Sequence, residues 1–532
     1  MKNMKKLLAI ILAVASVAST FTACGSKSNA DVSGGTVVEE QLEGSLISKD
    51  KKTFSIFLNF NNMPFDSEWE IWQEIGKRTN IYLEGIIPKT SSDEKQSFTN
   101  MINSGELADI IGFVDAAALE ELGRDGGLIP LNDLIDKYAP NIKRTFEEND
   151  KVRRYATSLD GNIYQIPKAI KTKVTEYWWI RGDWLEKLNL EVPTTVDELY
   201  DVLTAFRNND PNGNGIKDEI PLFDRAGYKM PDEYLYLWDT STEFYVRDGK
   251  VEFEPLEPNF KTGVTNIAKW YREGLIDPEI LTRGSKSRDV LLGGDIGGLT
   301  HDWQSAASYN KTLANDIPGF KMIGMAPPAD QNGKIKERTE SSPVVGWGIS
   351  STCKDPVTVI KFMDYFFSEE GANLVNWGVE GDTYIVDENG NKVFTDKVVN
   401  SGKSALAYLR SMGCQYRIGM DHDPAFEMAS AIEDARETIK MYNDHPEWYA
   451  EDMPPYVDGA LTLKYMPEDE KEYNKIMGNI RPYVDECFQK WLLGISDFEA
   501  DYPGFVESLK KRGIDRAIEI NQKAYDIFVG RN

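Results

Sequence analysis

The chain of 532 residues is poor in the side chains that most nucleophilic and metal-dependent catalysis requires. It contains three histidines and four cysteines, and it has no G-x-S-x-G or H-E-x-x-H signature. Cys353, Cys414 and Cys487 are widely spaced and form no C-x-x-C pair. Their spacing and odd number argue against a disulfide framework or a zinc site. We therefore expect a protein that is not an enzyme, with these cysteines buried as apolar residues.

Positive charge is also scarce. The chain has 60 lysines and arginines against 86 aspartates and glutamates, which gives a formal net charge of -26. The phosphates of nucleic acids and anionic lipid headgroups would repel so acidic a chain. The composition therefore argues against nucleic acid as a partner.

Long apolar runs are limited to the start of the chain. Three lysines precede the run Leu7 to Val17, which is shorter than the about 20 residues that span a bilayer and is typical of a secretory signal. The sequence F-T-A-C-G around Cys24 resembles the lipobox of bacterial lipoproteins, in which the cysteine is acylated. We expect a signal peptide at 1–23 and a lipidated flexible tether at 24–50, anchored to the outer face of the cell membrane. The alternative is an ordinary signal peptide with an incidental cysteine.

The body of the chain alternates strand and helix patterns. In the first part, five segments follow one another as strand, helix, strand, helix and strand: 54–58, 69–75, 81–83, 96–102 and 109–113. This order predicts an α/β sheet with mostly parallel strands, and the C-terminal third is rich in helical patterns. Because such sheets bind ligands at the carboxyl ends of their strands, Asn59 and Asn61 would lie at a binding edge, unless they only shape a turn.

A loop of ten residues, Asp210 to Glu219, carries the most specific chemical motif. Calcium takes six to eight oxygen ligands, which an EF-hand-type loop supplies at alternating positions. The donors in the corresponding positions here are Asp210, Asn212, Asn214, the carbonyl of Ile216, and Asp218. Pro221 occupies the twelfth position, so Glu219 would supply the bidentate carboxylate. We predict a structural Ca²⁺ site; the alternative is a polar turn without metal.

Four stretches together resemble one family. They are 181–188, 210–222, 376–384 and 524–526. They look like the large extracellular solute-binding lipoproteins of carbohydrate ABC importers (family 1-type), in particular those with an EF-hand-like calcium loop, which include alginate-oligosaccharide binders. The resemblance implies a two-lobed, periplasmic-binding-protein-like α/β fold of type II, with three hinge crossings, a ligand cleft between the lobes and a helix-rich C-terminal part.

The resemblance also suggests where the lobes divide. The crossings are expected near Pro167 to Thr172, near Met325 to Val344 and near Trp377 to Asp387. The N-terminal lobe would then comprise 51–168 and 343–380, and the C-terminal lobe 169–342 and 381–532. Closure of the lobes around the ligand is the expected motion.

A sugar cleft needs aromatic faces and planar hydrogen-bonding groups, and the chain has 12 tryptophans and 24 tyrosines. Aromatic residues also fill cores, so for each tryptophan except Trp303 a core position is an equal alternative. At most one of Trp178 and Trp179 can face the core if they share a strand. Arg181 would serve an acidic sugar, although the acidic composition argues mildly against a strongly anionic polymer. The expected contacts are Asn59, Asn61, Trp178, Trp179, Arg181, Asp302, Trp303, Trp347, Trp377, Glu380 and Tyr384.

The function that these features predict is capture of an oligosaccharide by a monomeric binding protein and its delivery to an ABC transporter permease. Two alternatives stay open. A secreted glycoside hydrolase would need two positioned carboxylates, which 86 acidic residues do not exclude. A peptide-binding protein of the same fold would favour strands that pair with a peptide backbone over stacked tryptophans.

Overall fold

The computed structural model describes residues 43–60, 63–91, 93–170, 176–225, 231–337, 344–449 and 463–530. The chain divides into two units, Met1–Glu43 and Gly44–Asn532, and all elements below belong to the second. The expected signal peptide, Cys24, most of the tether and Asn61 lie outside the described residues.

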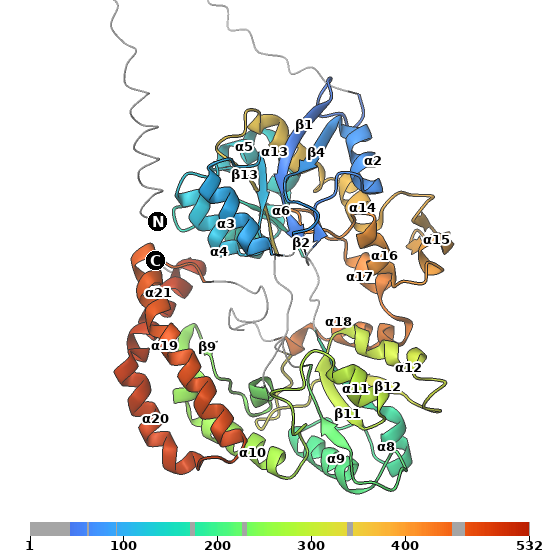
Figure 1. Cartoon of the computed structure of the whole chain (residues 1–532), viewed down its shortest axis with the longest axis vertical. Helices are drawn as coiled ribbons and strands as arrows, with labels where there is room; N and C mark the ends of the chain where they lie inside the picture. Colours follow the sequence, from blue (N-terminus) through green and yellow to red (C-terminus); the bar gives the residue numbers. More distant parts are fainter. Residues whose placement is uncertain are drawn as a thin grey trace, which may run out of the picture. The chain divides into compact units, whose positions relative to one another are not determined.

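The first lobe is built on a five-stranded sheet (Figure 1). Its order is β4 (Ile81–Gly85), β1 (Lys52–Phe57), β5 (Ile110–Gly112), β13 (Val344–Ile349) and β6 (Ile166–Lys168). Strands β4, β1 and β5 are parallel, whereas β13 runs antiparallel to β5 and to β6. The sequence prediction of an α/β sheet with strands at 54–58, 81–83 and 109–113 is confirmed.

Helices surround this first sheet. Those that precede β6 are α2 (Glu70–Thr79), α3 (Glu94–Ser104), α4 (Ala116–Arg124), α5 (Asn132–Tyr138), α6 (Pro140–Glu148) and α7 (Asp150–Ala156). Those that follow β13 are α13 (Pro356–Tyr365), α14 (Glu369–Trp377), α15 (Asp396–Val399), α16 (Ala405–Ser411) and α17 (Pro424–Ser430). Two short hairpins, β2 (Asn59–Phe60) with β3 (Met63–Pro64) and β14 (Tyr384–Val386) with β15 (Lys392–Phe394), complete the lobe.

The second lobe has a four-stranded sheet in the order β12 (Met322–Met325), β7 (Tyr177–Arg181), β11 (Gly297–Asp302) and β8 (Ile220–Leu222). Its other elements up to β12 are α8 (Gly182–Leu188), α9 (Val196–Asn208), η1 (Pro231–Trp238), β9 (Phe244–Arg247), β10 (Lys250–Phe253), η2 (Glu254–Leu256), α10 (Pro258–Arg272), α11 (Ser287–Gly293), η3 (Gln304–Ser308) and α12 (Tyr309–Thr312). The elements after α17 are η4 (Glu433–Ala435), α18 (Arg436–Asp444), η5 (Pro446–Trp448), α19 (Pro467–Leu492), α20 (Phe498–Arg512) and α21 (Ile514–Phe528).

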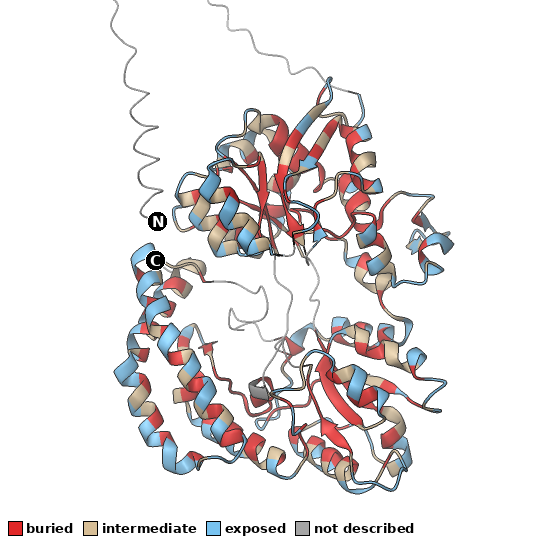
Figure 2. Cartoon of the chain, viewed as in Figure 1, coloured by how far each residue is buried: buried red, intermediate tan, exposed pale blue. Residues whose placement is uncertain are grey.

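Strand β7 lies inside its sheet with a neighbour on each edge and with both faces covered. All five of its residues are buried, and in Figure 2 the strands of the second lobe are drawn mostly in the colour of buried residues. Trp178 and Trp179 point to opposite faces, as successive residues of a strand do, and each face packs into its own apolar cluster. The expectation that at most one of them faces a core is therefore wrong, because a sheet covered on both sides leaves no solvent face.

The third crossing lies elsewhere than expected. Trp377, Tyr384 and Phe426 share one apolar cluster with the strands of the first sheet, whereas Ala431 and Ile439 pack with strands of the second. The change of core therefore falls between Phe426 and Ala431, not near Trp377 to Asp387, and residues 381–430 do not join the second lobe. Local apolar patterns show which residues are buried, but they do not show which of two cores receives them.

No helix in the described part of the chain is both long and apolar enough to cross a membrane. Cys353, Cys414 and Cys487 are free thiols, of which Cys414 is buried and the other two are partly buried.

Close packing between β13 and β6 makes Gly346 sensitive to substitution. A Cβ at this position would lie 1.9 Å from the carbonyl oxygen of Ile166 and 2.8 Å from the backbone nitrogen of Gly419. We expect Gly346→Ala to lower the free energy of unfolding by about 1–3 kcal/mol or more, since overpacking typically costs this much. Calorimetry should show a lower midpoint of thermal unfolding. Gly478 in α19 is the control, since its Cβ would meet no atom within 4 Å. Gly478→Ala should stabilise the helix by about 1 kcal/mol, and an equal loss in both variants would contradict this account.

Candidate functional site

The edges at which the two sheets are connected carry the candidate site. The chain leaves the first sheet at the carboxyl end of β6 and enters the second at the amino end of β7; it returns from the carboxyl end of β12 to the amino end of β13. The carboxyl ends of β1, β4 and β5 lie at the same edge as these first-sheet ends, and those of β8 and β11 at the same edge as the second-sheet ends. Ligands of open α/β sheets bind at such ends.

On the second sheet this edge carries an exposed aromatic ring. Trp303 follows the last residue of β11 and is 38% exposed, which makes it the one exposed tryptophan of the described residues. The neighbouring Asp302 is buried and forms ion pairs with Arg288 at 3.2 Å and Arg225 at 3.3 Å. Burial raises the pKa of Asp302, and the two guanidinium groups partly offset this effect. The charge network therefore holds the end of β11 in place beside the tryptophan.

Directly beside it lies a buried group of charges around His301. Its Nδ1 lies 2.8 Å from Oε1 of Glu233, and its Nε2 lies 3.2 Å from Oε2 of Glu337. Burial alone would lower the pKa of His301, but Glu337 and Glu233 outweigh it and raise the pKa to about 10. The side chain of Trp178 packs on this ring, with centroids 5.0 Å apart. A histidine with this pKa is a fixed imidazolium at neutral pH and is poorly suited to general acid–base work.

His301 also joins the segments that run between the lobes. Glu176 directly precedes β7, and Glu337 lies in the connection from β12 to β13. The ligand atoms of Glu176, Glu233 and His301 all lie within 4.8 Å of one another, so these groups have the spacing of a metal site. A metal would have to displace the proton that the carboxylates retain on His301. A protonated His301 surrounded by carboxylates therefore accounts for the close spacing of these groups without a metal ion.

On the first sheet the corresponding edge presents a buried amide. Asn59 follows β1 by two residues, and its side chain is fully buried. Neither its Oδ1 nor its Nδ2 has a hydrogen-bond partner among the described residues. Because buried polar groups are nearly always paired, the position is consistent with a ligand contact. Asn61, the other asparagine expected here, lies outside the described residues.

Several other expected contacts lie in the cores instead. Trp179, Trp347 and Trp377 have no exposed surface. These three predictions are wrong, because the large aromatic residues that border the crossings are needed to fill the two cores. Tyr384 is also buried and packs on Trp377 at a centroid distance of 5.8 Å, whereas Glu380 is exposed.

Arg181 stands at the carboxyl end of β7, the opposite edge from Trp303. Its Nη2 pairs with Asp183 at 2.7 Å and with Asp295 at 2.6 Å. The guanidinium also packs on Trp184 and Phe320, with its Cζ 4.4 Å from each ring centroid. Both acidic partners lie within the lobe, so the expected role in binding an acidic sugar is wrong, and Arg181 serves to hold the lobe together.

Sequence reasoning missed a cationic group beside Asn59. The ring of Phe60 lies 5.2 Å from Cζ of Arg410 and 5.6 Å from Cζ of Arg417. Lys168, the last residue of β6, donates from Nζ to Oε1 of Gln415 at 3.0 Å. These residues come from distant parts of the sequence. The only local signal was a pair of arginines within the apolar stretch 409–420.

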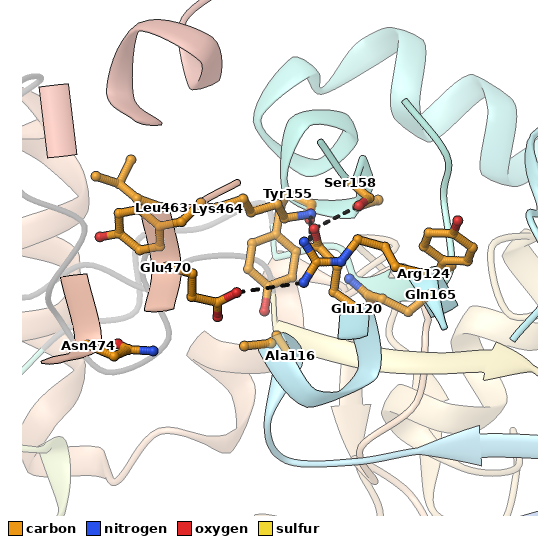
Figure 3. A pocket seen from close by; sticks show the side chains of 14 residues that line it. Ala116, Glu120, Arg124, Tyr155, Ser158, Gln165, Leu463, Lys464, Glu470 and Asn474 are labelled. Atoms are coloured by element: carbon orange, nitrogen blue, oxygen red, sulfur yellow. Dashed lines mark hydrogen bonds and ion pairs between the residues drawn. The ribbon is translucent and has the colours of Figure 1, made fainter. Parts of the chain in front are cut away.

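A cavity of about 250 Å³ is lined by Tyr155, on which the charge of Arg417 acts. Figure 3 shows the side chains that line this cavity. Its walls combine α4, α7 and the segment between α7 and β6 of the first lobe with the start of α19 and the residues just before it. Lys464 donates from Nζ to the carbonyl oxygens of Tyr155 (2.9 Å) and Thr157 (2.6 Å) and pairs with Glu120 (3.0 Å). Burial raises the pKa of Tyr155 to about 12, partly offset by the charge of Arg417. Tyrosine rings and amide groups thus line a hollow to which both lobes contribute.

The polar loop before β8 lies at the amino end of that strand, at the edge opposite Trp303. Asp210 Oδ1 accepts from the amide of Asn214 at 3.1 Å, and the side-chain nitrogen of Asn212 donates to the carbonyl oxygen of Asp295 at 3.0 Å. Glu219 is buried, and neither of its carboxylate oxygens has a hydrogen-bond partner in the described structure. Burial raises the pKa of Glu219, and the charges of Asp218 and Asp210 add to this effect. Such a set of oxygen donors fits a hard cation.

Two α/β lobes are connected at strand ends that carry an exposed tryptophan, a buried amide without a partner among the described residues, and cationic groups. This arrangement defines a two-lobed solute-binding protein. The family model for the bacterial extracellular solute-binding proteins matches residues 70–373. The chain belongs to this family.

Named relatives agree with this assignment. The fructooligosaccharide ABC transporter substrate-binding protein FusA of Streptococcus pneumoniae serotype 4 is 28% identical over 547 aligned positions, which cover 97% of each chain. Lipoprotein LipO of Bacillus subtilis is 27% identical over 60% of this chain and 64% of its own. Among solved structures, the alginate-binding protein AlgQ2 without calcium ion superposes with a TM-score of 0.73 at 34% identity, covering 91% of this chain and all of AlgQ2.

The charge of His301 gives a testable dependence of stability on pH. Its pKa of about 10 in the folded protein lies above the ordinary value of 6.5. The stability that it contributes is therefore fully present below about pH 6.5 and is lost as the pH rises towards 10. We expect the unfolding midpoint of the wild type to fall between pH 6.5 and 10 by more than that of His301→Gln. His445→Gln, at an exposed histidine, should keep the wild-type slope. Parallel curves for the wild type and His301→Gln would contradict the assignment.

Proposed function

We propose that this protein captures an oligosaccharide between its lobes and delivers it to the permease of an ABC transporter. FusA, which aligns over nearly the whole chain, is a substrate-binding protein of that kind for fructooligosaccharides. AlgQ2 binds alginate. The shared fold and family support the same general role here, while the particular sugar depends on the side chains of this chain.

The observation that carries the proposal is the exposed ring of Trp303 at the carboxyl end of β11. A pyranose ring packs its C–H face on an aromatic ring, and its hydroxyl groups need planar donors and acceptors. Asn59 offers such a group at the edge of the first sheet, where its amide has no partner among the described residues. The cavity walled by Tyr155, Gln165 and Tyr465 adds further aromatic and amide surface. Ligand sites generally combine apolar walls with a few well-placed polar groups in this way.

A glycoside hydrolase is less well supported. Hydrolysis needs one carboxyl group as an acid and a second that is free to act as base or nucleophile. At the edge of the second sheet, Asp302 is held by two arginines and Glu233 by His301. We therefore propose a binding protein without catalytic activity.

We further propose that the loop before β8 binds a structural Ca²⁺. The ligands would be Asp210, Asn212, Asn214, the carbonyl of Ile216, Asp218 and Glu219. The buried carboxylate of Glu219, without a hydrogen-bond partner, supports this proposal. One related structure is that of AlgQ2 without calcium ion, and another is that of an EF-hand mutant of FusA. The loop stands at the edge opposite Trp303, so the ion would stabilise the lobe and take no part in ligand binding.

The remaining parts of the proposal concern location and motion. Acylation of Cys24 would anchor a monomeric protein outside the cell membrane, and the relative LipO is a lipoprotein. The hinges would lie where the chain changes core, between β6 and β7, between β12 and β13, and after Phe426. Closure about these segments would bring the two strand edges onto the ligand.

Sugar binding can be tested by thermal unfolding of the protein from residue 25 onward with a panel of plant, algal and host oligosaccharides. A ligand at 100 times its dissociation constant adds about 2.7 kcal/mol to the free energy of unfolding, which should raise the midpoint by a few degrees. Trp303→Ala should lose most of this shift, because it removes the exposed ring, whereas Ile495→Ala, at an exposed position in the turn between α19 and α20, should retain it. A shift with peptides alone, or release of sugar products on long incubation, would overturn the proposal.

Calcium binding can be tested on the same protein without sugar. We expect chelation to lower the unfolding midpoint by a few degrees and added Ca²⁺ to restore it, since a ligand that binds only the folded state stabilises it. Glu219→Gln should remove most of this response, because it removes the buried carboxylate charge. Glu388→Gln, in an exposed turn of the first lobe, should respond as the wild type does. A midpoint that is insensitive to chelator would exclude the calcium site.

A further inference from the structure

The edge of the first sheet carries positive charge that the protein itself does not neutralise. Arg410 and Arg417 both pack on Phe60. Within the described residues neither forms an ion pair or a hydrogen bond, and the Nε of each is buried without a partner. This arrangement is unusual in a chain with a net charge of -26, where carboxylates are abundant.

Other buried or partly buried arginines of the protein show the usual arrangement. Arg181, Arg247 and Arg283 each have a carboxylate oxygen between 2.6 and 2.9 Å from the guanidinium. Burial lowers the pKa of Arg410 and of Arg417, with Glu427 and Glu94 as the more distant negative charges. Burial of a charge without a partner costs free energy. An anion that paired with the two guanidinium groups would offset this cost.

Lys168 adds a third positive charge to the same place. Within the described part of the chain, its Nζ contacts one polar atom, the amide oxygen of Gln415. Burial lowers its pKa to about 8, Glu427 partly opposes this, and the nearby Arg410 lowers it further. The carboxylate of Glu427 lies 2.9 Å from Nε2 of His422, whose pKa burial lowers, so that this imidazole is neutral. Arg410, Arg417 and Lys168 thus outnumber the two carboxylates, Glu427 and Glu94, that act on them. The described groups around Phe60 therefore leave an excess of positive charge.

The position of this cationic group connects it with the proposed ligand site. Phe60 follows Asn59 at the carboxyl end of β1, and Lys168 ends β6 at the same edge of the sheet. The charge of Arg417 also reaches Tyr155, which lines the cavity between the first lobe and α19. An oligosaccharide bound at this edge would thus lie within reach of the guanidinium groups.

We propose that the captured oligosaccharide is acidic and that Arg410 and Arg417, with Lys168 beside them, bind a sugar carboxylate next to the ring of Phe60. This inference rests on the proposed function and specifies its ligand. The planar guanidinium matches a carboxylate better than any other side chain does, and both guanidinium groups are held beside the ring of Phe60.

The test compares acidic oligosaccharides with matched neutral ones by calorimetric titration. The probes are galacturonate and alginate trimers to hexamers, each alongside its carboxyl-reduced form. We expect at least one acidic series to bind at least tenfold more tightly than its reduced form, and its affinity to fall as salt is raised. Equal binding of an acid and its reduced form, or binding of neutral sugars only, would overturn the inference while leaving sugar capture intact. Failure of every oligosaccharide to bind would instead reject the proposed function.

The residues are tested by Arg410→Gln and Arg417→Gln. Each should weaken binding of the acidic probe at least tenfold and reduce the salt dependence of that binding. Lys403→Gln is the matched control, since it removes one exposed positive charge from the same lobe and should have no effect. Retention of full affinity by both arginine variants would overturn the assignment. The comparison of acid with reduced sugar on the wild type remains decisive even where a variant folds poorly.

Discussion

The structure depends on how the chain passes between its two sheets. The crossings from β6 to β7 and from β12 to β13 each join the edge of one sheet at which parallel strands end to the corresponding edge of the other. Sheets of α/β proteins bind ligands at this edge. The order of the strands along the chain is therefore enough to place the ligand-binding edges of both sheets at the segments that connect the lobes. The buried ion cluster of His301, Glu233 and Glu337 lies where these segments meet the second sheet. The hinge region is therefore a charged, hydrogen-bonded core rather than an apolar one.

A second constraint is the use of aromatic residues. Ten of the twelve tryptophans are buried and Trp69 is partly buried, so Trp303 alone is exposed. Two lobes with separate cores, one of them containing a sheet covered on both faces, need large side chains to fill them. The abundance of tryptophan therefore reflects packing first. The residue that remains exposed at a strand end is the informative one for binding, which composition could not show.

The features that the sequence predicted correctly are those encoded within about ten residues. Strands β1, β4 and β5 follow from short apolar segments that alternate with helical patterns along the sequence. The oxygen donors from Asp210 to Glu219 form one continuous loop. The third crossing and the group around Phe60 depend instead on contacts across more than 200 positions. An example is the hydrogen bond from the backbone nitrogen of Ala169 to the carbonyl oxygen of Met420, which places the stretch before α17 beside the first sheet. No local pattern determines that choice between two cores.

The net charge of the chain, like its local sequence patterns, does not predict the charge at the binding edge of one sheet. The acidic composition argued mildly against an anionic ligand, but that argument concerns the charge of the whole molecule. At physiological ionic strength, charges more than about 8 Å apart in water are largely screened, so most of the 86 carboxylates act weakly on a ligand at one edge. Arg410 and Arg417 act at contact distance and are partly shielded from water, where screening is much weaker. Affinity for the proposed acidic sugar would therefore be set by the few charges at the edge of the first sheet, and the net charge would mainly oppose the approach of such a ligand from a distance.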